Sequence, residues 1–136
     1  INDRYQMHTK QAPYRTYALA YRLPAGAMAD ALYWDMEDPY HYIRLSESAV
    51  HPGEMLCIVG GADHKAGQQG DEAECFAKLD AWARAKMPFL GELAYRWSGQ
   101  VLEPADGLPF AGLSPESSHE EDHGIYLISG DSGMGM

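Results

Sequence analysis

Residues 14–23 alternate in character along the chain. Aromatic and aliphatic residues stand at every second position, at Tyr17, Leu19, Tyr21 and Leu23. This period of two is typical of a strand with one buried face. Three shorter runs rich in strand-forming residues follow at 31–36, 40–46 and 54–60. Turn-prone segments separate these runs, so the pattern predicts consecutive strands in an antiparallel sheet.

The pattern changes to a helical period between Asp71 and Met87. Its apolar stripe consists of Phe76, Leu79, Ala83 and Met87, with Trp82 beside it. Acidic residues occupy the first turn and basic residues the last, and both signs complement the helix dipole. The alternation of a strand resumes from Leu93 to Trp97. The sequence therefore predicts an α+β fold with a mixed, largely antiparallel sheet and one main helix.

Composition excludes several classes of function. The chain has 136 residues and a formal net charge of -10, which argues against nucleic acid or an anionic membrane as partner because both require a basic surface. No apolar run reaches the roughly 20 residues that span a bilayer. The two cysteines, Cys57 in an apolar strand-like run and Cys75 in a helix-like run, are as expected of buried thiols in a reduced, cytoplasmic protein.

Two glycine-rich segments carry the most specific signal. The first runs from Arg96 to Gly112 and contains Trp-Ser-Gly followed by Pro-Ala-Asp-Gly-Leu-Pro-Phe-Ala-Gly; the second runs from Gly130 to Met136 after a strand-like Ile125–Ser129. Together they resemble the C-terminal flavin-contacting region of the D-amino-acid oxidase-like family of FAD-dependent amine and amino-acid oxidoreductases. The resemblance implies flavin contacts at Ser98, Gly99, Gly130, Ser132, Gly133 and Met134.

The resemblance extends over most of the chain. Residues 1–4 and 8–17 are similar to the family's entry into its substrate-binding sheet, and residues 38–44 and 59–65 are similar to two of its strands. No Gly-x-Gly-x-x-Gly fingerprint for the FAD pyrophosphate follows a strand. We therefore expect an internal fragment of a longer enzyme. Residues 1–102 would form a substrate-binding domain, and residues 103–136 would return to an FAD-binding domain outside this chain.

Three residues are candidates for substrate contact. Tyr42 and Arg44 stand two positions apart and should share one strand face, where Arg44 could hold a substrate carboxylate through paired hydrogen bonds. His64 resembles a pocket histidine of the sarcosine oxidase branch. Each residue type is also common in structural roles, in the core or in solvent. The residues alone assign no catalytic group.

A metal site is not expected. His119 and His123 are four positions apart with acidic residues between them, but Pro115 and Gly124 flank them and no third ligand stands nearby. A hydrated acidic loop explains this segment better than a zinc site.

The resemblance implies an enzyme that removes a hydride from the C–N carbon of an amine or amino acid and passes it to FAD. The fragment alone would be inactive. Some relatives with this kind of sequence are fused to a Rieske [2Fe–2S] domain, which would lie outside this chain. The alternative is a non-catalytic module for small-molecule binding or oligomerisation, with the tyrosine-rich sheet as its contact surface.

Overall fold

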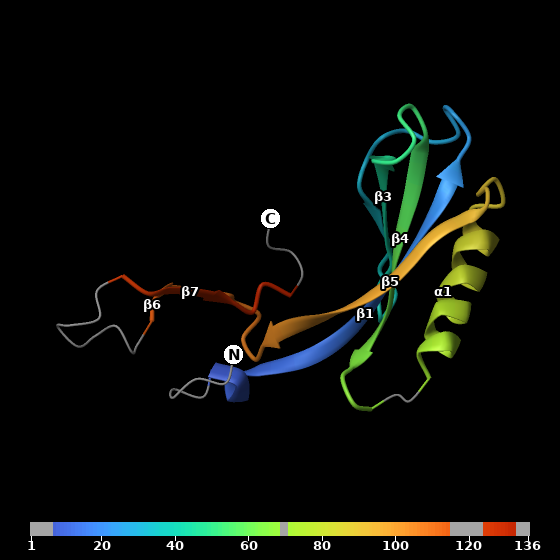
Figure 1. Ribbon diagram of the computed structural model, residues 1–136. Helices are drawn as coiled ribbons and strands as arrows, with labels where there is room; N and C mark the ends of the chain where they lie inside the picture. The colour runs from blue at the N-terminus through green and yellow to red at the C-terminus, as the bar shows by residue number, and fades with distance from the viewer. Residues whose placement is uncertain (1–6, 69–70, 115–123, 133–136) are drawn as a thin grey trace. The chain divides into compact units, whose positions relative to one another are not determined.

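A computed structural model describes residues 7–68, 71–114 and 124–132 (Figure 1). After a 3-10 helix at Met7–Lys10, one helix and seven strands follow in the order β1 Gln11–Leu23, β2 Tyr33–Trp34, β3 Tyr42–Glu47, β4 Met55–Lys65, α1 Glu72–Lys86, β5 Leu93–Pro104, β6 Phe110–Leu113 and β7 Tyr126–Ser129. The pairs β2-β3, β3-β4 and β6-β7 are antiparallel. The predicted α+β fold with one main helix is confirmed.

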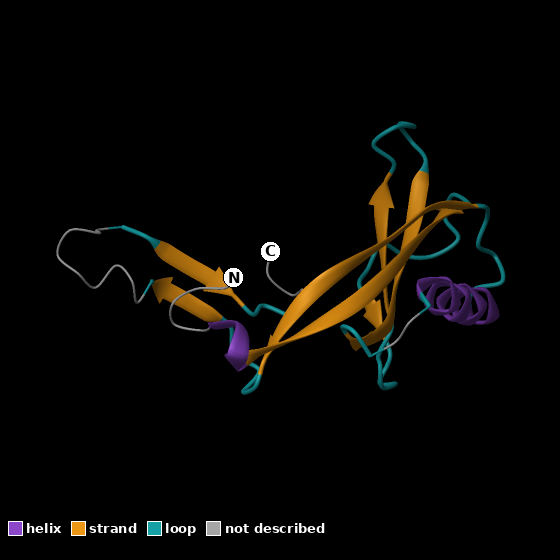
Figure 2. Cartoon of the chain, turned by 60° about the horizontal axis from the view of Figure 1, so that its bottom comes forward, coloured by secondary structure: helices purple, strands orange, loops and turns teal. Residues whose placement is uncertain are grey.

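The strands form a five-stranded sheet in the order β2-β3-β4-β1-β5 and a separate pair, β6-β7. The chain divides into two compact units, one of residues 15–99 and one of residues up to Tyr14 with those from Gln100 onward. In the first unit, α1 lies along one face of the sheet (Figure 2). We call the opposite sheet face the far face.

The core lies between α1 and the sheet. It contains the predicted alternating residues of β1 together with Cys57 and Val59 of β4 and Leu79 of α1. Burying large apolar and aromatic side chains of this kind is the main source of stability in a domain of this size. Both cysteines are buried free thiols, as predicted. Tyr21 is fully buried, and its hydroxyl donates to Asp80 on α1 at 2.7 Å.

Local sequence sets the ends of α1. The Asp71 carboxylate accepts a hydrogen bond from the Ala73 N–H at 2.9 Å, which caps the first turn. Arg84 and Lys86 lie in the last turn, where the helix dipole favours positive charge. The helix has 15 residues, and in the described part of the chain no helix combines the length and hydropathy needed to cross a membrane.

The strands differ from the prediction at β2 and β6. β2 contains only Tyr33 and Trp34, because the Asp35 carboxylate accepts the His41 N–H and closes the intervening turn. β6 was not predicted as a strand and pairs with β7 from Phe110 opposite Ser129. In this second unit Gln11 and Ser129 hydrogen-bond through their side chains at 3.1 Å.

Candidate functional site

Tyr42 and Arg44 lie on the far face of the sheet. In the β3-β4 register Tyr42 pairs with Gly60 and Arg44 with Ile58, whereas the intervening Ile43 packs against the core on the α1 side. Because side chains alternate across a strand, Tyr42 and Arg44 share one face. The sequence prediction placed them together for the same reason. No carboxylate in the described parts of the chain forms an ion pair with the exposed Arg44.

The Tyr42 ring occupies space that only a glycine partner leaves free. A Cβ added at Gly60 would overlap the Tyr42 ring, and one added at Gly61 would stand 2.6 Å from Cδ2 of His41. An aromatic ring thus covers a glycine across the strand pair, an arrangement known to pin register in sheets. Burial raises the pKa of the Tyr42 phenol, and the nearby Asp63 carboxylate raises it further. Tyr42 is therefore a neutral hydrogen-bonding group at neutral pH.

β4 is irregular after its glycine pair. Gly61 has φ 156° and Ala62 has φ 56°, a left-handed conformation that is uncommon outside glycine. His64 then bonds to Tyr17, whose ring packs edge-on against Phe76 of α1. Asp63 bonds to Thr16, which alternates with Tyr17 and so faces the far side. The irregularity, which has the form of a β-bulge, directs Asp63 and not His64 toward the face of Tyr42.

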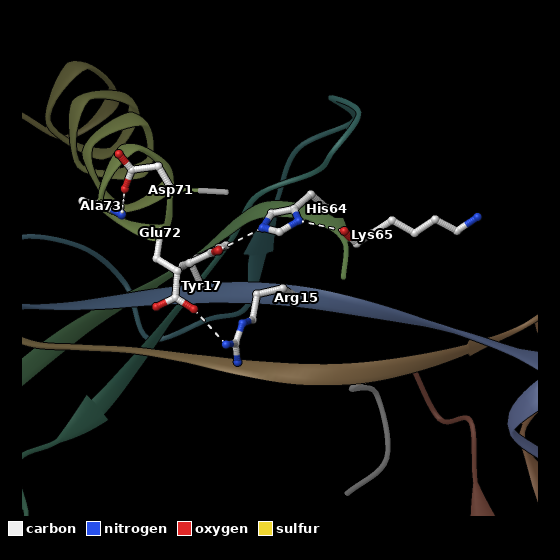
Figure 3. A network of polar contacts seen from close by, with 7 residues as sticks. All are labelled: Arg15, Tyr17, His64, Lys65, Asp71, Glu72 and Ala73. Atoms are coloured by element: carbon white, nitrogen blue, oxygen red, sulfur yellow. Dashed lines mark hydrogen bonds and ion pairs between the residues drawn. The ribbon is translucent and has the colours of Figure 1, made fainter. Parts of the chain in front are cut away.

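Figure 3 shows that both ring nitrogens of His64 have partners. Nε2 lies 2.9 Å from the Tyr17 hydroxyl, and Nδ1 lies 3.0 Å from the Lys65 carbonyl oxygen. A carbonyl oxygen only accepts, so Nδ1 donates to it, and Nε2 pairs with the Tyr17 hydroxyl. Burial raises the pKa of Tyr17 to about 12, which keeps that hydroxyl protonated. His64 is thus held on the α1 side, apart from Tyr42 and Arg44, and its predicted contact with substrate remains a prediction.

Asp63 is the ionisable residue that the sequence prediction missed. Its Oδ1 atom is buried, and among the described residues it has no hydrogen-bond partner. Burial raises the pKa of the carboxyl, while the Thr16 hydroxyl and the nearby His41 and His64 rings oppose the rise. An unpartnered buried acceptor costs about 1–3 kcal/mol. The signal in the sequence was the glycine pair, because glycine inside a strand often marks a bulge.

The α1 side of the sheet carries a hollow of about 280 Å³ at the end of α1. His41 borders it and stacks on Trp82, with ring centroids 4.0 Å apart. Asp35, Glu37 and His41 bring potential metal-ligand atoms within 4.8 Å of one another. However, His41 Nδ1 already lies 2.9 Å from Asp35 Oδ2, so a hydrogen bond between the two side chains accounts for the cluster. The segment His119–His123 lies outside the described residues.

Asp35 is expected to make stability depend on acid pH. Partial burial acts to raise its pKa, but hydrogen bonds from the His41 backbone and ring outweigh this and hold the pKa below the ordinary value. The stabilisation should therefore be complete above about pH 4 and be lost as the pH falls through the lower folded pKa. Urea unfolding at several pH values would show the difference between wild type and Asp35→Asn shrinking in acid. Asp30→Asn, at an exposed loop position, is the control.

The expected flavin-contacting residues differ in their surroundings. In β5 an added Cβ at Gly99 would meet nothing within 4 Å, so the backbone beside Ser98 is open to a flat ring. In the second unit Gly130 packs against Pro104 and Gln11, and the Ser132 N–H donates to the Leu102 carbonyl at 3.3 Å. Gly133 and Met134 lie outside the described residues. The fit to a flavin is therefore clearest at Ser98 and Gly99.

A family model described as FAD dependent oxidoreductase matches residues 3–136. The chain belongs to this family. It is also 29% identical over 122 residues to the putative Rieske 2Fe-2S iron-sulfur protein YhfW of Bacillus subtilis (strain 168), a match that covers 90% of this chain and 22% of the relative. The chain thus spans about a fifth of the length of that curated relative. No solved structure matches the chain significantly.

Proposed function

We propose that this chain is the substrate-binding part of an FAD-dependent oxidoreductase that oxidises an amine or amino acid. Family membership supports FAD as the cofactor. The observation that carries the substrate class is the pair Tyr42 and Arg44 on one sheet face, with an exposed guanidinium that lacks a carboxylate partner among the described residues. Such a guanidinium suits the carboxylate of an amino acid.

The bound FAD would accept the hydride from the carbon that bears the amine. Within this chain, Ser98 and Gly99 would bring an open stretch of backbone to the flavin ring, because a Cβ added at Gly99 would meet no atom of the described residues within 4 Å. The segment around Gly130, Ser132, Gly133 and Met134 would add backbone N–H groups. Since the Ser132 N–H is already bonded to Leu102, its own contribution would come from the side chain.

The residues of the far face would orient the substrate. Arg44 would bind its carboxylate through two parallel N–H donors, which fixes direction as well as position. Tyr42, neutral and locked over Gly60, would offer a hydroxyl at a fixed point beside it. Positioning of this kind contributes to catalysis because it holds the reacting carbon close to the ring that receives the hydride.

The proposal also covers the domains that would accompany this chain and its cellular compartment. The FAD-binding domain of the same parent chain would supply the contacts to the adenine and pyrophosphate, so the fragment alone would be inactive. The name of the relative supports a Rieske [2Fe–2S] cluster in a further domain of the parent. The buried free thiols are consistent with a cytoplasmic protein.

The test is the visible spectrum of the purified full-length protein during anaerobic addition of single amines and amino acids. We expect flavin absorption that bleaches with one chemical class of compound. A flavoprotein that no amine or amino acid reduces would contradict the proposed substrate. A colourless protein that takes up no FAD would contradict the proposal of a flavoenzyme. The non-catalytic binding module would then be the better explanation.

A further inference from the structure

The glycine pair of β4 positions a carboxylate beside the candidate substrate site. After Gly61 and Ala62 the strand resumes with Asp63 on the face of Tyr42, because His64 is held on the α1 side by Tyr17. A left-handed alanine is strained, and strained backbone persists where the surrounding structure imposes it, often at functional sites. Bulges of this kind commonly re-aim a side chain next to an active site.

The hydrogen bonding of Asp63 is incomplete. Thr16 donates to the carboxylate, yet Oδ1 is buried and has no donor within the described residues. Buried acceptors in proteins almost always have a donor, so Oδ1 is open to a donor that the described residues do not supply. The terminal torsion of an aspartate is soft, so the carboxylate can turn toward a donor that arrives on this face.

We propose that Asp63 binds the amine end of the substrate. The inference rests on the proposed function and narrows it to compounds that bind as cations. A carboxylate and an ammonium attract most strongly where water is excluded, and the far face around Tyr42 is partly buried. Arg44 lies further along the same face, on the other side of Tyr42 from the bulge. An amino acid would then be bound at its two ends by residues of opposite charge.

The experiment compares two ligands of similar shape and different charge. Benzylamine, a cation at neutral pH, and benzyl alcohol are titrated anaerobically into the full-length flavoprotein at constant ionic strength, and the flavin spectrum reports binding. We expect wild type to bind benzylamine about tenfold or more tightly than benzyl alcohol, since a charge-assisted hydrogen bond contributes to only one complex. In Asp63→Asn this preference should disappear, with the affinity for benzyl alcohol unchanged.

Asp30→Asn is the matched control, because it removes one negative charge from an exposed loop of the same unit. If Asp63→Asn does not retain flavin, the proposal is tested by the wild-type protein alone. Equal affinity of wild type for benzylamine and benzyl alcohol would then overturn the proposal. A flavoprotein in which Asp63→Asn keeps the preference for benzylamine would overturn the role of Asp63 alone. A protein without flavin would overturn the proposed function and this inference together.

Discussion

Replacing Gly60 with alanine is expected to destabilise the folded protein by about 2 kcal/mol and to displace the Tyr42 ring from the sheet. The added Cβ would overlap the ring, which lies directly across the strand pair from Gly60. Relief of the overlap requires a new rotamer of Tyr42 or a shift of β3. Urea denaturation would measure the loss, and substrate binding should weaken with it.

A double-mutant cycle tests this cause directly. In a Tyr42→Ala background the overlap is absent, so adding Gly60→Ala should then cost little. The difference between the two backgrounds isolates the interaction between the positions. An equal cost in both backgrounds would show that alanine is unfavourable here for another reason, such as backbone conformation, and would contradict the account of Tyr42.

The sheet and the helix follow from patterns that a single sequence displays. The alternation of Tyr17, Leu19 and Tyr21 predicted β1, and the helical stripe with its charged ends predicted α1. These signals are strong because burial of one face requires them along the whole element. The shared face of Tyr42 and Arg44 followed from the same alternation.

The irregularity in β4 could not be placed from the pattern. One extra residue in a strand exchanges the faces of every side chain beyond it. A sequence reading that continues the alternation from Gly60 puts His64 on the face of Tyr42, whereas the structure puts Asp63 there. Only the cross-strand contacts decide where the extra residue lies. Strand β6 was not predicted for the same reason. Its identity as a strand depends on pairing with the distant β7, which the local pattern does not show.

The difference between His64 and Asp63 changes the chemistry expected of the site. A neutral histidine would serve as a weak donor or acceptor, but both nitrogens of His64 have partners within the first unit. Asp63 instead presents a carboxyl group whose Oδ1 atom is buried without a hydrogen-bond partner among the described residues. The face on which the sequence placed Tyr42 and Arg44 therefore also carries a carboxyl group.

Replacing Arg44 with methionine is expected to weaken binding of an amino-acid substrate by about 100-fold, the effect of losing paired charge-assisted hydrogen bonds. Methionine keeps much of the length and flexibility of the side chain. Because Arg44 is exposed and has no carboxylate partner among the described residues, its removal should leave the fold intact. Anaerobic flavin reduction at increasing substrate concentration would give the dissociation constant and the limiting rate separately.

Arg44→Lys distinguishes geometry from charge. Lysine retains the positive charge but presents a point charge in place of the planar guanidinium, so it should recover part of the affinity and leave a deficit of about tenfold. Benzylamine, which has no carboxylate, should bind wild type and both variants alike. An unchanged dissociation constant for the amino acid in Arg44→Met would show that the carboxylate is bound elsewhere. The far face of β3 would then not be part of the substrate site.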